Sequence, residues 1–103
     1  MEKVYDISEI RRALRPVFAE YPVYSATLFG SYAKGKATEQ SDVDIVIDSR
    51  GQLLNMDFYG VLDKITERLG KSVDLFEISE IHNPSPIYAD IQKEGVLLYD
   101  RQG

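Results

Sequence analysis

The chain has 103 residues and no cysteine. Its length predicts one domain over residues 1–103, and the absence of cysteine excludes disulfides, thiolate metal sites and cysteine nucleophiles. A formal net charge of −5 disfavours a high-affinity nucleic-acid binder, because contacts with phosphate dominate such affinity. Charges throughout the N-terminal segment exclude a signal peptide and no later apolar run reaches membrane-spanning length, so we expect a cytoplasmic protein without a membrane partner.

Hydrophobic periodicity predicts helices and strands that alternate along the chain. In chain order, we expect a helix over 7–20, a strand over 23–29, a short helix over 32–36, a strand over 42–48, a helix over 54–69, a strand over 72–78, a helix from Pro84 or Pro86 to Lys93, a strand over 96–99 and a frayed tail over 101–103. Pro16 is expected to kink the first helix or to start a second short turn, because an interior proline costs about 3 kcal/mol. The order predicts an α/β (α+β) fold, with a small mixed sheet of about four strands and helices packed on it.

Residues 28–48 carry the pattern that indicates chemistry. Asp42 and Asp44 are two positions apart in the second predicted strand, so their side chains are expected on one face. Like charges on one strand face repel, and a divalent cation is the simplest partner for them. Gly30 and Ser31 end the first predicted strand, where backbone amides and a hydroxyl can approach a phosphate closely. Together these residues predict a nucleotide site that uses magnesium.

A third carboxylate, Asp74, lies between Val73 and Leu75 in the third predicted strand. If this strand lies beside the second, Asp74 joins the other two carboxylates at one edge of the sheet. Three carboxylates can hold two metal ions for an in-line displacement, and Asp74 can also take the proton of an incoming hydroxyl. The structural alternatives are a solvated aspartate pair at a strand start and an exposed edge residue at position 74. Lys36 and Lys71 are interpreted as solvated.

Gly30-Ser31, ten intervening residues, Asp42-Val43-Asp44 and a later Asp74 closely resemble the nucleotidyltransferase superfamily of DNA polymerase beta. More narrowly, LFGSYAKG with SDVDIVID in so short a chain resembles the minimal nucleotidyltransferases, the MntA-like antitoxins that are paired with HEPN-domain toxins. The resemblance covers nearly the whole chain and implies the nucleotidyltransferase core fold.

The resemblance also implies a role for each matching residue. Asp42, Asp44 and Asp74 are the implied ligands of two Mg²⁺ ions, and Gly30 and Ser31 are the implied contacts of the ATP triphosphate. Lys34 stands where many relatives have arginine. It keeps the charge but loses the bidentate fork, so the sequence leaves a phosphate role and a packing role open for this lysine.

The implied activity is the transfer of AMP from ATP to a tyrosine hydroxyl of a cognate HEPN ribonuclease toxin, which neutralises the toxin within a hetero-oligomer. Two alternatives remain open. One is an antitoxin that only binds and sequesters the toxin and keeps a vestigial nucleotide site. The other is nucleotidyl transfer to a small molecule such as an aminoglycoside or to RNA ends. Relatives with those acceptors have additional domains, and the acidic charge disfavours RNA.

Overall fold

Four strands form one mixed sheet in the computed structural model of the protein, which describes residues 4–101. The elements in chain order are α1 (Ile7–Glu20), β1 (Ser25–Phe29), β2 (Val43–Asp48), α2 (Met56–Leu69), β3 (Val73–Glu77), the short 3₁₀ helix η1 (Ile78–Glu80), α3 (Pro86–Glu94) and β4 (Val96–Asp100). The strand order across the sheet is β3-β2-β1-β4. β1 runs antiparallel to β2 and β4, whereas β2 and β3 are parallel. The predicted α/β fold with a mixed four-stranded sheet is confirmed.

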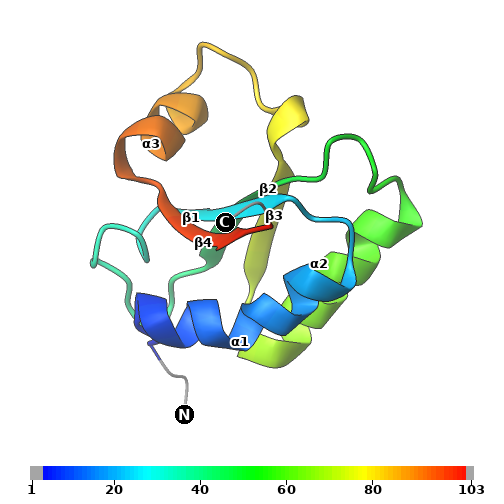
Figure 1. Cartoon of the computed structure of the whole chain (residues 1–103). Coiled ribbons are helices and arrows are strands. Elements are labelled where there is room, and N and C mark those ends of the chain that lie inside the picture. The colour runs from blue at the N-terminus through cyan, green and yellow to red at the C-terminus, as the bar shows by residue number, and fades with distance from the viewer. Residues whose placement is uncertain (1–3, 102–103) are drawn as a thin grey trace.

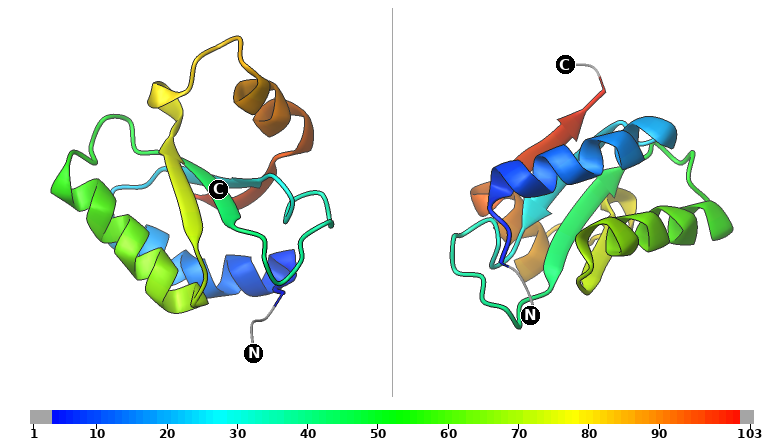
Figure 2. Two further views of the ribbon diagram at one scale, coloured as in Figure 1. Left: turned by 180° about the vertical axis from the view of Figure 1, so that it is seen from behind. Right: turned by 90° about the horizontal axis from the view of Figure 1, so that it is seen from below.

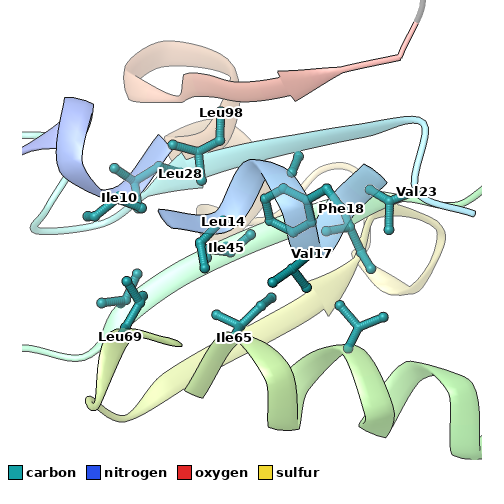
Figure 3. Packing of buried hydrophobic residues seen from close by; sticks show 14 of the residues in the cluster. Ile10, Leu14, Val17, Phe18, Val23, Leu28, Ile45, Ile65, Leu69 and Leu98 are labelled. Atoms are coloured by element: carbon teal, nitrogen blue, oxygen red, sulfur yellow. The ribbon is translucent and has the colours of Figure 1, made fainter. Parts of the chain in front are cut away.

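The two faces of the sheet are covered differently. α1 and α2 lie on one face, and α3 lies on the other (Figures 1 and 2). The main core fills the space between the sheet and the first two helices (Figure 3) and includes Ile10, Leu14, Phe18, Leu28, Ile45, Ile65 and Leu98. A smaller cluster of Phe29, Val46 and Ile91 lies on the α3 side. Since side chains alternate along a strand, Asp44 shares the α3 face with Val46.

The start of helix α1 is set by hydrogen bonds between the residues at its N-terminus. The Asp6 carboxylate accepts a hydrogen bond from the Glu9 amide at 2.8 Å, and the Glu9 carboxylate accepts one from the Asp6 amide at 3.0 Å. This reciprocal pair is a capping box, which satisfies amides that have no partner within the helix. A single helix then runs through Pro16 to Glu20, so a second turn starting at Pro16 is excluded. None of the helices within residues 4–101 has the length and apolarity needed to cross a membrane.

Two predicted helical segments differ in the structure. Residues 31–35 form hydrogen-bonded turns in place of the short helix predicted over 32–36, since the left-handed Gly35, at φ +70°, ends the segment. Helix α2 begins at Met56 because Asn55 has a left-handed φ of +50°, which breaks the helical path. Leu54, predicted on the buried face of this helix, therefore lies before it and is 65% exposed.

Arg101, predicted to begin a frayed tail, binds the C-terminal end of α1. Its guanidinium donates hydrogen bonds to the carbonyls of Phe18 at 3.0 Å, Tyr21 at 2.7 Å and Val23 at 3.0 Å. A helix C-terminus leaves carbonyls without partners and carries partial negative charge, so a cation there is stabilising. Residues 102 and 103 lie outside the described part of the chain.

Replacing Arg101 by alanine is expected to lower the free energy of unfolding by about 1–3 kcal/mol, because three carbonyls lose a charged donor. Urea denaturation followed by circular dichroism measures this change. Arg12→Ala is the matched control, since Arg12 is an exposed arginine on α1. A loss for Arg101→Ala that is no larger than the loss for Arg12→Ala contradicts the structural role of Arg101.

Candidate active site

Asp44 and Asp74 lie side by side on neighbouring strands. They are register partners in the parallel pairing of β2 with β3, and such strands are about 4.8 Å apart. Asp44 is half-buried and Asp74 is exposed. The adjacency of the second and third strands, on which the prediction of a joint carboxylate site depended, is confirmed. Their roles as metal ligands or base remain predictions.

Burial raises the pKa of Asp44 to about 6, and the negative charge of Asp74, a hydrogen bond with Asp74 and the charges of Asp42 and Asp90 act in the same direction. A group of repelling carboxylates favours the binding of a cation, which removes the repulsion. Across residues 4–101, however, no three acidic or histidine side chains are arranged to hold a metal ion together. The carboxylates of Asp44 and Asp74 therefore offer two ligands on one side of a cation. A third protein ligand requires rotation of a neighbouring side chain toward them.

Asp42, the third predicted ligand, precedes β2 and does not belong to the strand. Its side chain is exposed and lines a small cavity with Glu39, Ser41, Lys71 and other residues. The sequence predicts a solvated Lys71, but the structure buries this lysine to 8% exposure. Because Asp42 is exposed, its carboxylate has the freedom to turn toward Asp44.

Gly30 brings the chain against the Asp44 carboxylate. β1 ends at Phe29, the register partner of Asp44, and Gly30 continues with a left-handed φ of +74°. A Cβ atom at position 30 would collide with the Asp44 carboxylate. The close approach and the positive φ both require glycine here.

The turn after Gly30 presents backbone amides beside this carboxylate. The amide of Lys34 donates to the Gly30 carbonyl at 3.2 Å, and the amide of Lys36 donates to the Ser31 carbonyl at 3.0 Å. No backbone carbonyl of residues 4–101 accepts a hydrogen bond from the amides at positions 31–33. Successive unpaired amides in a turn make a concavity that binds anions. The arrangement is suited to a phosphate group, with the Ser31 hydroxyl as a further donor.

Lys34 forms an ion pair with Asp90 of α3, with 2.9 Å between the Lys34 Nζ and an Asp90 carboxylate oxygen. The hydrogen bond to Asp90 raises the pKa of this lysine, and the charges of Glu94 and Asp44 add to the effect. Sequence reasoning missed Asp90, because an aspartate in a surface helix has no signal that places it beside a turn more than fifty residues away. Lys34 is thus near the carboxylates but already has a partner.

The raised pKa of Asp44 gives a pH dependence of stability. The protonated form is favoured in the folded state, so the contribution of this group is fully present below pH 3.8 and is lost as pH rises through about 6. Asp44→Asn removes the ionisable group, so the variant is expected to be more stable than the unaltered protein at pH 8 and equally stable near pH 4. Denaturation in EDTA at both pH values measures this difference. Equal changes at both pH values, or the same change in the exposed control Asp63→Asn, would count against burial and carboxylate repulsion as the cause.

Comparisons with known proteins agree with this architecture. The sequence profile of the family described as Polymerase beta, Nucleotidyltransferase matches residues 12–103. A Methanocaldococcus jannaschii protein named as a putative protein adenylyltransferase is 36% identical over 87 residues, which cover 82% of this chain and 87% of that relative. A chain in the crystal structure of a toxin–antitoxin with AMP-PNP superimposes with a TM-score of 0.73 at 22% identity, covering 89% of this chain and 74% of that chain.

A further solved structure has the same fold. It is described as a tri-AMPylated HEPN toxin of Shewanella oneidensis in complex with an MNT antitoxin. A chain in it superimposes with a TM-score of 0.68 at 19% identity, over 93% of this chain and 74% of that chain.

Proposed function

Because the chain belongs to the polymerase beta nucleotidyltransferase family, we propose that it is an antitoxin that transfers AMP from ATP to a tyrosine hydroxyl of a partner HEPN ribonuclease toxin. The names of the relatives as protein adenylyltransferases support AMP as the transferred group. Likeness of fold to chains in toxin–antitoxin complexes, one of which is a HEPN toxin with an MNT antitoxin, supports the class of partner. The acceptor is then a separate folded protein.

One observation carries the proposal: two carboxylates in register on neighbouring strands lie beside a glycine turn with unpaired amides. The amides after Gly30 and the Ser31 hydroxyl would bind the triphosphate. Asp42, Asp44 and Asp74 are the residues that would hold Mg²⁺. When bound, two Mg²⁺ ions would supply positive charge against the triphosphate and the developing phenolate of the tyrosine.

The transfer itself is an in-line displacement. The tyrosine oxygen of the acceptor forms a bond to the α-phosphorus of ATP, and the bond from that phosphorus to the oxygen bridging the β-phosphate breaks. Pyrophosphate leaves with the electron pair, and the hydroxyl proton passes to the carboxylate of Asp74, which is exposed on the edge strand β3. The backbone amides after Gly30 orient the triphosphate, and the half-buried Asp44 would hold Mg²⁺ beside it. The Lys34 ammonium would balance phosphate charge once it exchanged Asp90 for the nucleotide.

Labelled ATP distinguishes this chemistry from phosphoryl transfer. The protein, its partner toxin and Mg²⁺ are incubated with ATP labelled at either the α- or the γ-phosphate. Label from the α-phosphate alone is expected on the toxin, with pyrophosphate released. Label from the γ-phosphate, or α-label on RNA or a small molecule without any protein partner, contradicts the proposal.

The alternative of an antitoxin that only sequesters its toxin makes a different prediction. Neutralisation would then need an amount of antitoxin equal to the amount of toxin, and would survive the loss of Asp42 and Asp44. The ion pair of Lys34 with Asp90 is compatible with either function.

A further inference from the structure

The side chain of Lys71 is buried, and the proposed function leaves it without a role. Among the charged residues within positions 4–101, only Lys71 is buried, with 8% of its surface exposed. Its ammonium donates a hydrogen bond to the Glu39 carbonyl at 3.1 Å. The aliphatic stem of a lysine can pack against the protein while its ammonium stays near water, and the bond to Glu39 is only partly buried. The position of the Lys71 ammonium is therefore fixed by its bond to the Glu39 carbonyl.

The location of Lys71 is set by the elements around it. Helix α2 ends at Gly70, which has a left-handed φ of +64°, and Lys71 follows directly. The next residue, Ser72, accepts a hydrogen bond from the Val43 amide at 3.0 Å, which joins the starts of β2 and β3. Lys71 therefore lies at the end of the sheet where both β2 and β3 begin.

The turn that Lys71 contacts leads directly into Asp42. Within this turn, the Thr38 amide donates to the Ser41 hydroxyl at 2.9 Å, and the Ser41 amide donates to the Thr38 carbonyl at 3.1 Å. The turn is thus closed on itself, and the bond from Lys71 to Glu39 attaches it to the segment before β3. A polar cavity of about 170 Å³ is lined by Lys71, Asp42, the turn residues 39–41 and Ser72.

We propose that Lys71 is a positioning residue for Asp42: through its bond to the Glu39 carbonyl it fixes the turn over residues 38–41, and with it the backbone from which the Asp42 side chain extends. The inference rests on the proposed function, in which Asp42 holds a cation. It gives the Asp42 backbone a fixed position although this residue lies outside the strand, so that its side chain can turn toward Asp44 from a defined point.

Binding of Mn²⁺ to the full chain tests the proposal without any turnover. Paramagnetic broadening of the backbone amide resonances around Gly30 and Asp44 gives the dissociation constant, and the remaining resonances report the fold. Lys71→Met is expected to raise the Mn²⁺ dissociation constant by about 10-fold or more, as is typical when a group supporting a metal ligand is lost. Lys71→Arg, which keeps the charge and a donor, is expected to restore most of the affinity. Lys64→Met, at an exposed lysine of α2, is the control and leaves the affinity unchanged.

The sign of the change separates positioning from charge alone. Removing a positive charge near a cation site weakens repulsion and would tighten Mn²⁺ binding, so unchanged or tighter binding by Lys71→Met overturns the proposal. If Lys71→Met does not fold, Lys71→Gln replaces it, and an affinity of this variant equal to that of the unaltered protein overturns the proposal. Absence of Mn²⁺ binding by the unaltered protein instead contradicts the metal role of the carboxylates, and the positioning role falls with it.

Discussion

Replacing Asp42 and Asp44 together by asparagine is expected to lower the rate of AMP transfer to the toxin by about 1,000-fold or more. Asparagine keeps the size of each side chain but removes the charge that would hold Mg²⁺, and electrostatic stabilisation is usually the largest contribution to a transfer of this kind. Initial rates of incorporation of α-labelled ATP into the toxin measure the effect.

The control for this double variant removes two carboxylates elsewhere. Asp63→Asn with Glu67→Gln alters two exposed positions of α2 and changes the net charge by the same amount, so its transfer rate is expected to stay within about twofold of the unaltered rate. Transfer by the Asp42 and Asp44 double variant at the same rate as this control would falsify the assignment of the site.

Gly30→Ala is expected to have the second largest effect, a loss of transfer of about 100-fold or more. The left-handed φ of +74° costs a side chain about 1–2 kcal/mol, and the added methyl group also collides with the Asp44 carboxylate. Displacing a group that orients the substrate by about 1 Å is enough for a change in rate of this size. Transfer rates and denaturation curves are measured on the same preparation.

Gly51→Ala separates the two causes. Gly51 has a similar φ of +77°, but a Cβ atom there meets nothing within 4 Å, and the residue lies beyond the other end of β2. This variant is expected to lose stability through the backbone alone and to keep its transfer rate. Equal losses of transfer in both glycine variants would show that backbone strain, and not the contact with Asp44, explains the effect.

The fold could be predicted from the sequence because its elements depend on local patterns. Periodic apolar residues define α1 and α2, β-branched runs define the strands, and Gly70 ends the second helix with a left-handed conformation. The sequence could not establish that β2 pairs with β3, because strand order is set by contacts between distant segments. The prediction of a joint carboxylate site was therefore conditional on this pairing. Asp74 could be proposed, because a carboxylate in an apolar strand is unusual.

The parts of the site that sequence reasoning missed depend on tertiary contacts. Asp90 reaches Lys34 only because α3 lies over the same face as the glycine turn. Lys71 is buried only because the end of α2, the start of β3 and the turn before Asp42 meet there. Neither residue differs in sequence from an ordinary surface charge, so no local pattern marks it.

The central claim, that neutralisation is catalytic transfer and not sequestration, is tested most directly with far less antitoxin than toxin. One part of the protein is mixed with about a hundred parts of toxin, ATP and Mg²⁺, and intact mass and ribonuclease activity of the toxin are then measured after the antitoxin has been removed. We predict that nearly all of the toxin gains the mass of one or more AMP groups on tyrosine and stays inactive. Toxin that keeps its original mass, or that recovers its activity once the antitoxin is removed, would contradict catalytic transfer.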